Sequence, residues 1–179
     1  MHIGEIIIKK PNLINSLCNF FVIFFEETKM ARILVSACLL GVECRYKGDS
    51  CPCQNIIGLG KDHTLIPVCP EQAGGLPTPR TPSERVGDKV IMRDGTDVTS
   101  EYRKGAGTAL YLAKTLNADL AILKANSPSC GKGTIYDGTF SGGKCAGNGV
   151  TAELLINNGI PVYTEDEIDL INLNIRVKE

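Results

Sequence analysis

Three short apolar runs in this chain each lead into a cysteine, and this arrangement limits the fold more than any other feature. Cys38 and Cys69 end the first two runs, and Cys130 follows the third after a short loop. Short runs rich in branched aliphatic residues are typical of parallel strands buried on both faces. The carboxyl ends of parallel strands meet at one edge of a sheet, where open α/β folds bind their ligands. We therefore expect the three sulfur atoms to emerge at the same edge.

Segments with helical periodicity alternate with the apolar runs. Thr164 and Glu167 match a capping box at the start of the last helix, and Gly159 suits the end of the helix before it. The predicted strands are 33–38, 64–69, 119–124 and 160–163, and the predicted helices are 54–59, 100–116, 150–158 and 164–173. This alternation predicts an α/β fold, a three-layer α/β/α sandwich with a mainly parallel sheet of roughly four strands.

Two long connecting segments are rich in glycine or proline. Residues 70–82 are therefore predicted to contain neither a regular helix nor a central strand, and their length indicates that they wrap a site. Residues 125–149 are predicted to form a long loop with many glycines. Residues 85–92 are predicted to form an edge hairpin, with Asp94 and Gly95 as its turn.

The first 29 residues differ from the rest of the chain. The apolar stretch 13–25 is short for a membrane span, is interrupted by polar residues and lacks the cleavage site of a signal peptide. We expect Met30 to be the natural start and residues 1–29 to be an N-terminal extension from a mis-assigned start, which leaves 30–179 as a single domain. The alternative is an amphipathic helix that docks on the domain or on a membrane, and Cys18 is given no role.

The composition is that of an ordinary globular domain, with 43% hydrophobic and 22% charged residues. The net charge of −1 gives no bulk attraction to nucleic acid or to anionic membranes, and this favours a small molecule as the partner. The chain has eight cysteines, but its periodic strands and helices can build a core without disulfides. We therefore expect a reducing cytoplasm, with metal binding or redox chemistry at the cysteines.

Three thiolates at one edge of a sheet suggest a centre for a soft metal, with an iron–sulfur cluster favoured over zinc. Pro70 beside Cys69 and Gly131 beside Cys130 suit a backbone that lies close to a prosthetic group. The alternative is that each of the three cysteines is a small buried apolar residue at a strand end. For Cys38 taken alone, that plainer interpretation is favoured.

The other cysteines carry weaker signals. Cys51 and Cys53 are separated only by Pro52, which is too tight for a usual zinc pair. They are either a redox pair or solvent-facing loop thiols, and Cys44 belongs to the same group of cysteines. Cys145 lies in a glycine-rich stretch and is interpreted as a spare thiol. We assign none of these four cysteines a role.

Two residues near the cysteines have side chains suited to proton transfer or hydrogen bonding. Glu71 lies two residues after Cys69 and could act as a general acid or base, or it could be a solvated acid or an ion-pair partner of a nearby arginine. Ser127 and Ser129 flank Pro128 just before Cys130. Either hydroxyl could bond a cluster sulfide or a substrate carbonyl, whereas the plainer role is in a Ser-Pro turn.

Five motifs in this order are characteristic of one bacterial family. They are SACLLG at 36–41, CRY at 44–46, PVCPE at 67–71, GGLPTPR at 74–80 and SPSCG at 127–131. With these motifs the chain resembles a domain long catalogued as of unknown function, whose characterised members are thiouracil desulfidases of the TudS type. The resemblance covers roughly residues 31–164.

The resemblance implies a 4Fe-4S cluster held by Cys38, Cys69 and Cys130, whose fourth iron has no protein ligand. It also implies that this iron takes the sulfur of a thiolated uracil-type base or nucleotide, and that water replaces the sulfur without net redox change. Glu71 would then handle protons, and Ser127 would position or polarise the substrate. A cluster-bearing sensor or electron-transfer module and a structural zinc domain remain the alternatives.

Overall fold

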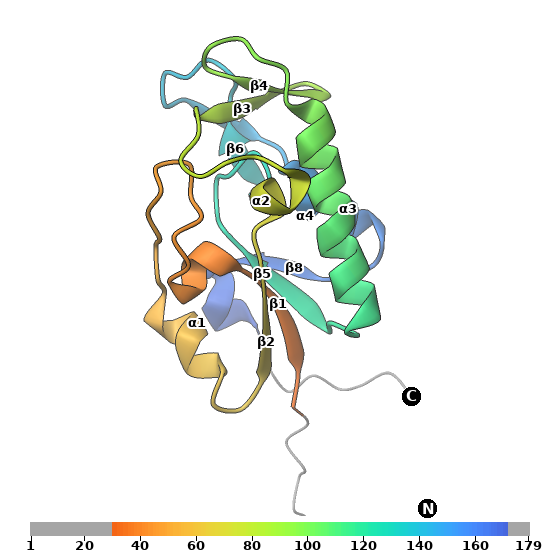
Figure 1. Cartoon of the computed structure of the whole chain (residues 1–179). Helices are drawn as coiled ribbons and strands as arrows, with labels where there is room; N and C mark the ends of the chain where they lie inside the picture. Colours follow the sequence, from red (N-terminus) through yellow and green to blue (C-terminus); the bar gives the residue numbers. More distant parts are fainter. Residues whose placement is uncertain (1–29, 172–179) are drawn as a thin grey trace, which may run out of the picture.

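The structure, a computed structural model, describes residues 30–171, so the predicted extension and Cys18 lie outside the described residues. Four parallel strands form the main sheet in the order β2–β1–β5–β8 (Figure 1). The strands are β1 (Arg32–Ser36), β2 (Thr64–Val68), β5 (Leu120–Leu123) and β8 (Val162–Thr164). All four predicted strands are confirmed, with ends shifted by at most two residues.

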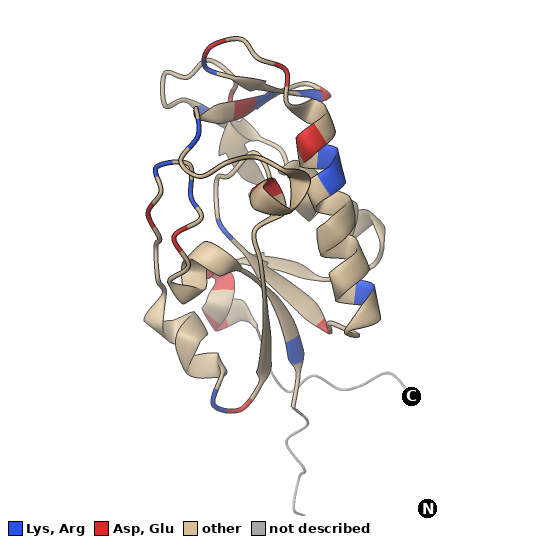
Figure 2. Ribbon diagram, viewed as in Figure 1, with Lys and Arg blue, Asp and Glu red and all other residues tan. Residues whose placement is uncertain are grey.

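Helical segments cover both faces of this sheet. On β1, Ile33 and Val35 pack in one core and Leu34 in the other, as the alternation of side chains along a strand requires. The first core is closed by α1 (Gln54–Leu59) and the 3₁₀ helix η2 (Glu165–Leu170), and the second by α3 (Thr99–Thr115) and α4 (Val150–Asn157). Because both faces are buried, the strands of the sheet are almost free of charged residues (Figure 2). The predicted three-layer fold is confirmed.

The segment 70–82 begins with a short helix, so the prediction that it holds no regular helix is wrong. Helix α2 runs over Pro70–Gly74. Proline is tolerated in the first turn because the backbone N–H that it lacks would have no partner there. Gly75 ends the helix with φ of 108°, a left-handed conformation that suits glycine. The proline and the glycine mark the boundaries of this helix and do not interrupt it.

Two antiparallel hairpins lie beyond the carboxyl edge of the main sheet (Figure 1). The first pairs β3 (Ser83–Val86) with β4 (Lys89–Met92) across a turn at residues 87–88. The predicted turn at Asp94 and Gly95 is present, but it follows β4 and is not the turn of this hairpin. The hairpin is a separate two-stranded sheet, not an edge of the main one. The second pairs β6 (Thr134–Tyr136) with β7 (Lys144–Ala146), within the segment predicted to be a loop. Its short strands have too few buried residues to give an alternating pattern.

None of the helices within residues 30–171 combines the length and the apolar character needed to span a bilayer. The predicted capping box of Thr164 and Glu167 is present, but it opens the 3₁₀ helix η2, which ends at Leu170.

Helices α2 and α3 touch backbone to backbone through two glycines. A Cβ atom on Gly105 would lie 1.8 Å from the carbonyl oxygen of Pro70, and one on Gly74 would lie 2.0 Å from that of Glu101. Both distances are far shorter than any real contact, so neither position has room for a side chain. Since α2 also carries Glu71, this contact fixes the position of Glu71 relative to α3.

Gly105→Ala is therefore expected to lower the free energy of unfolding by about 1–3 kcal/mol, because α2 must move away from α3. Gly107→Ala on the same helix is the matched control, since its Cβ would meet nothing within 4 Å. That change is expected to raise the free energy of unfolding by about 0.5–1 kcal/mol through the better helix propensity of alanine. Urea denaturation of both variants measures the difference, and equal midpoints would contradict the close contact.

Candidate active site

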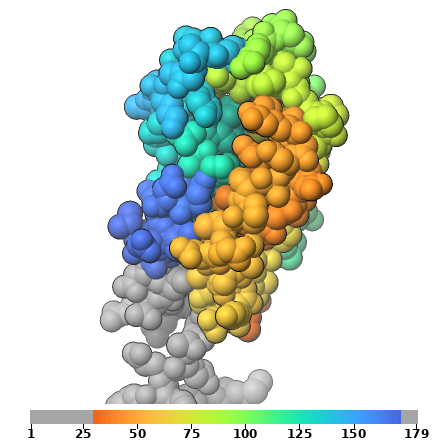
Figure 3. Space-filling model, turned by 90° about the vertical axis from the view of Figure 1, so that its left-hand side faces the viewer, coloured from red at the N-terminus to blue at the C-terminus, as the bar shows by residue number. Residues whose placement is uncertain are grey.

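A cavity of about 390 Å³ lies at the carboxyl edge of the main sheet. Its lower wall comes from the ends of β1, β2 and β5, and its upper wall includes residues of both hairpins, such as Glu84 and Tyr136. Arg45 and Tyr46, from the loop 41–53, line one side. Figure 3 shows that loop, in orange, beside the teal and light-blue residues that follow β5.

The three predicted cysteines all line this cavity. Cys38 lies in the 3₁₀ helix η1 (Ala37–Leu40) that follows β1, Cys69 precedes α2, and Cys130 lies in the loop after β5. Cys38 and Cys130 are buried and Cys69 is half-buried. Parallel strands thus bring together three thiols that are far apart in the sequence.

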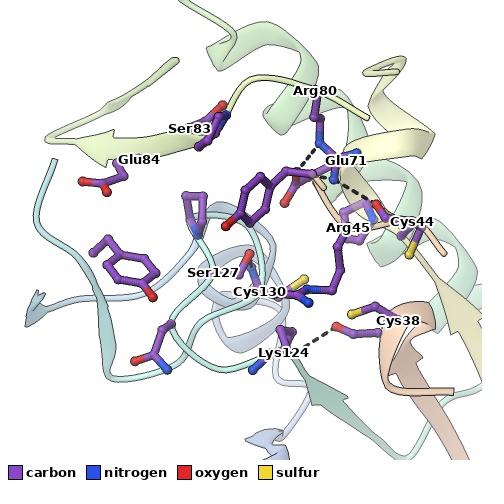
Figure 4. A pocket seen from close by; sticks show the side chains of 18 of the residues that line it. Cys38, Cys44, Arg45, Glu71, Arg80, Ser83, Glu84, Lys124, Ser127 and Cys130 are labelled. Atoms are coloured by element: carbon purple, nitrogen blue, oxygen red, sulfur yellow. Dashed lines mark hydrogen bonds and ion pairs between the residues drawn. The ribbon is translucent and has the colours of Figure 1, made fainter. Parts of the chain in front are cut away.

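A fourth cysteine, Cys44, also lines the cavity, and sequence reasoning gave it no role. It is buried, and its backbone carbonyl accepts a hydrogen bond from the Cys69 thiol at 3.8 Å. In Figure 4 the sulfur atoms of Cys38, Cys44 and Cys130 lie on one side of the pocket, opposite Glu84. Within residues 30–171, no three histidine, cysteine, aspartate or glutamate side chains lie close enough to hold a single metal ion.

The remaining cysteines of the described region do not line the cavity. Cys51 and Cys53 are half-buried and pack against the core beside Cys38, and Cys145 is exposed on β7. Every cysteine among residues 30–171 is a free thiol.

Three of the thiols that line the cavity, those of Cys44, Cys69 and Cys130, have a raised pKa. Burial raises the pKa of Cys130 to about 12. A hydrogen bond with Cys38, together with burial, raises the pKa of Cys44 to about 11. A hydrogen bond with Cys44 and burial raise the pKa of Cys69 as well. Because metals bind the thiolate, loading a metal here must release these protons.

Glu71 is positioned in the first turn of α2 and points into the cavity, where it pairs with Arg80. The Nε atom of Arg80 donates to Oε2 of Glu71 at 2.7 Å, and Nη2 lies 2.6 Å from the same oxygen (Figure 4). The sequence left two roles open for Glu71, an acid or base at the site and an ion-pair partner of an arginine. Glu71 lines the cavity, as an acid or base at the site must, and it also forms the ion pair with an arginine.

Ser127 and Ser129 have different surroundings. The hydroxyl oxygen of Ser127 accepts the backbone N–H groups of Ser129 at 3.1 Å and Cys130 at 3.2 Å, which is the turn chemistry expected for it. Ser127 also lines the cavity, and its hydroxyl hydrogen is not used in those bonds. Ser129 is fully buried and bonds to Thr151 at 2.9 Å. Of the two serines, only Ser127 can meet a bound molecule.

Further charged residues line the cavity and were not predicted, among them Lys124 and Glu84. Lys124 follows β5 directly and forms an ion pair with Glu165. Burial alone would lower the pKa of Lys124, but Glu165 more than offsets this and raises it. Glu84 accepts the backbone N–H groups of Gly138 at 2.9 Å and Phe140 at 3.0 Å, and so ties the two hairpins together. Lys124 could have been predicted as a site residue from its position directly after a strand. No local sequence pattern indicates that Glu84 lines the cavity.

Comparison with known proteins agrees with this arrangement. Residues 33–167 match the model of the 2-thiouracil desulfurase family. The chain belongs to this family. An uncharacterized Bacillus subtilis member, YbbK, is 46% identical over 147 residues, which are 76% of this chain and 97% of that protein. The predicted resemblance is confirmed, and with it the expectation of an enzyme of the thiouracil desulfidase type.

A solved structure is also similar to this chain. It is the [4Fe-4S]-dependent thiouracil desulfidase TudS, which is 46% identical in sequence and superimposes with a TM-score of 0.76. The match covers 80% of this chain and 96% of TudS. The α/β fold is therefore shared with a protein that depends on an iron–sulfur cluster.

Proposed function

We propose that this protein removes the sulfur of a thiolated uracil-type base or nucleotide and replaces it with the oxygen of water. In the balanced reaction the C=S group and water give the C=O group and hydrogen sulfide, without net oxidation or reduction. The observation that supports this most is that Cys38, Cys69, Cys130, Glu71 and Ser127 all line one cavity. Its volume of about 390 Å³ lies within the usual range of small-molecule sites.

The donor set of the cavity fits an iron–sulfur cluster. Thiolates are the usual ligands of such clusters, and Cys38, Cys69 and Cys130 would hold a 4Fe-4S cluster at the edge of the sheet. When bound, the cluster supplies a Lewis-acidic iron without a protein ligand that polarises a carbon–sulfur bond. Reduced thiols are needed to load it, which agrees with the cytoplasmic location expected from the sequence.

Glu71 and Ser127 would carry the proton chemistry. Glu71, which pairs with Arg80, would take a proton from the attacking water and later return it to the departing sulfur. The hydroxyl of Ser127 would donate to the carbonyl or ring nitrogen of the substrate and fix its orientation. These groups come from α2 and from the loop after β5, which are both anchored to the main sheet.

The position of Cys44 favours one competing function. A fourth thiol in the cavity could complete the ligation of a cluster, and a fully ligated cluster suits an electron-transfer protein or a sensor. Cys44 also has a structural role, because its backbone carbonyl accepts hydrogen bonds from Arg80 and from the Cys69 thiol. Because the chain belongs to the 2-thiouracil desulfurase family, we assign the three-cysteine set and an enzymatic role.

An anaerobic turnover assay tests the proposal. Protein reconstituted with iron and sulfide is incubated with 2-thiouracil, 4-thiouracil and thiouridine nucleotides in water enriched in ¹⁸O, and released sulfide is measured. We expect sulfide in equal amount to the uracil product, with one ¹⁸O atom in that product. A brown, iron-loaded protein that releases no sulfide from any of these compounds would favour the sensor or electron-transfer role. A colourless protein that binds only zinc would contradict both.

A further inference from the structure

Arg80 is the most completely engaged side chain of the cavity. Its Nη1 atom donates to the carbonyl oxygen of Pro77 at 3.0 Å and to the hydroxyl of Thr78 at 3.1 Å. Its Nη2 atom donates to the carbonyl oxygen of Cys44 at 3.0 Å, and Nε donates to Glu71. Only 3% of its side chain is exposed. All three nitrogens of the guanidinium group are held, so the plane of the group is fixed.

The contacts of Arg80 with Glu71 are one-sided. Both Nε and Nη2 approach Oε2, at 2.7 and 2.6 Å, and neither donates a hydrogen bond to Oε1. This differs from the usual fork, in which an arginine binds the two carboxylate oxygens in parallel. Both contacts with the arginine therefore fall on Oε2, while Oε1 accepts no hydrogen bond from it, in a residue that lines the cavity.

Arg80 also joins Glu71 to the cysteine side of the cavity. The carbonyl of Cys44 that accepts from Nη2 also accepts from the Cys69 thiol. One guanidinium group thus connects α2, which carries Glu71, with the loop that carries Cys44. A lysine could not replace it, because an ammonium group is a compact point charge without the rigid fork.

We propose that Arg80 is a positioning residue for this reaction, holding Oε2 of Glu71 so that Oε1 is the atom that exchanges a proton with water. The assignment rests on the proposed desulfidase function. Displacing a catalytic group by about 1 Å can reduce a rate about 100-fold, so a lysine at this position should slow turnover without removing the charge. An arginine that only stabilised the fold would act independently of Glu71.

A double-mutant cycle separates these two roles. Wild type, Arg80→Lys, Glu71→Gln and the double variant are reconstituted anaerobically, and kcat and KM are measured by sulfide release. Iron content and the dissociation constant of 2-thiouracil, from the visible absorbance of the cluster, give readouts independent of turnover. We expect Arg80→Lys to lower kcat by about 10–100-fold while iron content, the dissociation constant and KM stay within about twofold. In the Glu71→Gln background the same change should alter kcat by less than about twofold.

The control is Arg85→Lys, an arginine outside the cavity that pairs with Glu153 at 2.7 Å and should leave kcat unchanged. If Arg80→Lys is insoluble, Arg80→Ala is assayed with and without added guanidinium ion, which should restore part of kcat only where Glu71 is present. An equal loss in both backgrounds, or a loss of iron with the loss of kcat, would overturn the positioning role. Wild type that releases no sulfide would instead overturn the proposed function on which this assignment rests.

Discussion

Cys130→Ala is expected to lose the bound cluster and, with it, the release of sulfide. Cys130 is buried and lies in a loop that Ser127 fixes through two backbone hydrogen bonds, so no neighbouring thiol can move into its place without disturbing that loop. Even residues that only support a metal ligand change affinity by about 10–100-fold, and removal of a ligand should exceed this. We expect iron content, acid-labile sulfide and visible absorbance to fall to near zero, with activity reduced by more than about 100-fold.

Two other cysteine variants serve as controls for this result. Cys145→Ala removes an exposed thiol on β7 and should leave iron content and activity unchanged. Cys44→Ala removes the fourth thiol of the cavity and should still yield an iron-loaded protein. If Cys44→Ala loses iron while Cys130→Ala retains it, the assigned ligand set is wrong.

Glu71→Gln is expected to keep the cluster and lose turnover. The amide has nearly the same size and can still accept a hydrogen bond from Arg80, so the structure around α2 should persist. It cannot take up a proton from water, and general acid–base catalysis contributes about 10²–10⁴-fold to a rate. We expect kcat to fall by that factor, while iron content and the visible spectrum match those of the wild type.

Glu153→Gln is the matched control for this variant. Glu153 is also a glutamate in the first turn of a helix and also pairs with an arginine, Arg85, but it lies outside the cavity. That variant should turn over at the wild-type rate. Turnover of Glu71→Gln within about twofold of wild type would contradict the role given to Glu71.

The main sheet and the positions of its cysteines could be predicted from the sequence. Local features determine them, because a run of buried aliphatic residues favours a parallel strand and the strand direction places the following residue at the carboxyl edge. Cys38, Cys69 and Cys130 were found in this way, and Glu71 and Ser127 were found as their neighbours. Their roles as ligands and catalytic groups remain predictions.

Elements with weak local patterns were missed. Helix α2 is only one turn long and starts with proline, so its residues do not show a helical stripe. The β6–β7 hairpin has three-residue strands with little buried surface. Their stability depends on what they pack against, such as the contact of Gly74 and Gly105 that seats α2 on α3.

Neighbouring residues alone specify a parallel α/β sheet with three thiols at its carboxyl edge, since strand formation and strand direction are local properties of the chain. Only the tertiary structure brought Cys44 into the same cavity, paired Arg80 with one oxygen of Glu71 and placed Glu84 across from the cysteines. These contacts join loops that leave different strands. Which side chains meet in the cavity depends on how the loops pack over the sheet. No local sequence pattern predicts this packing.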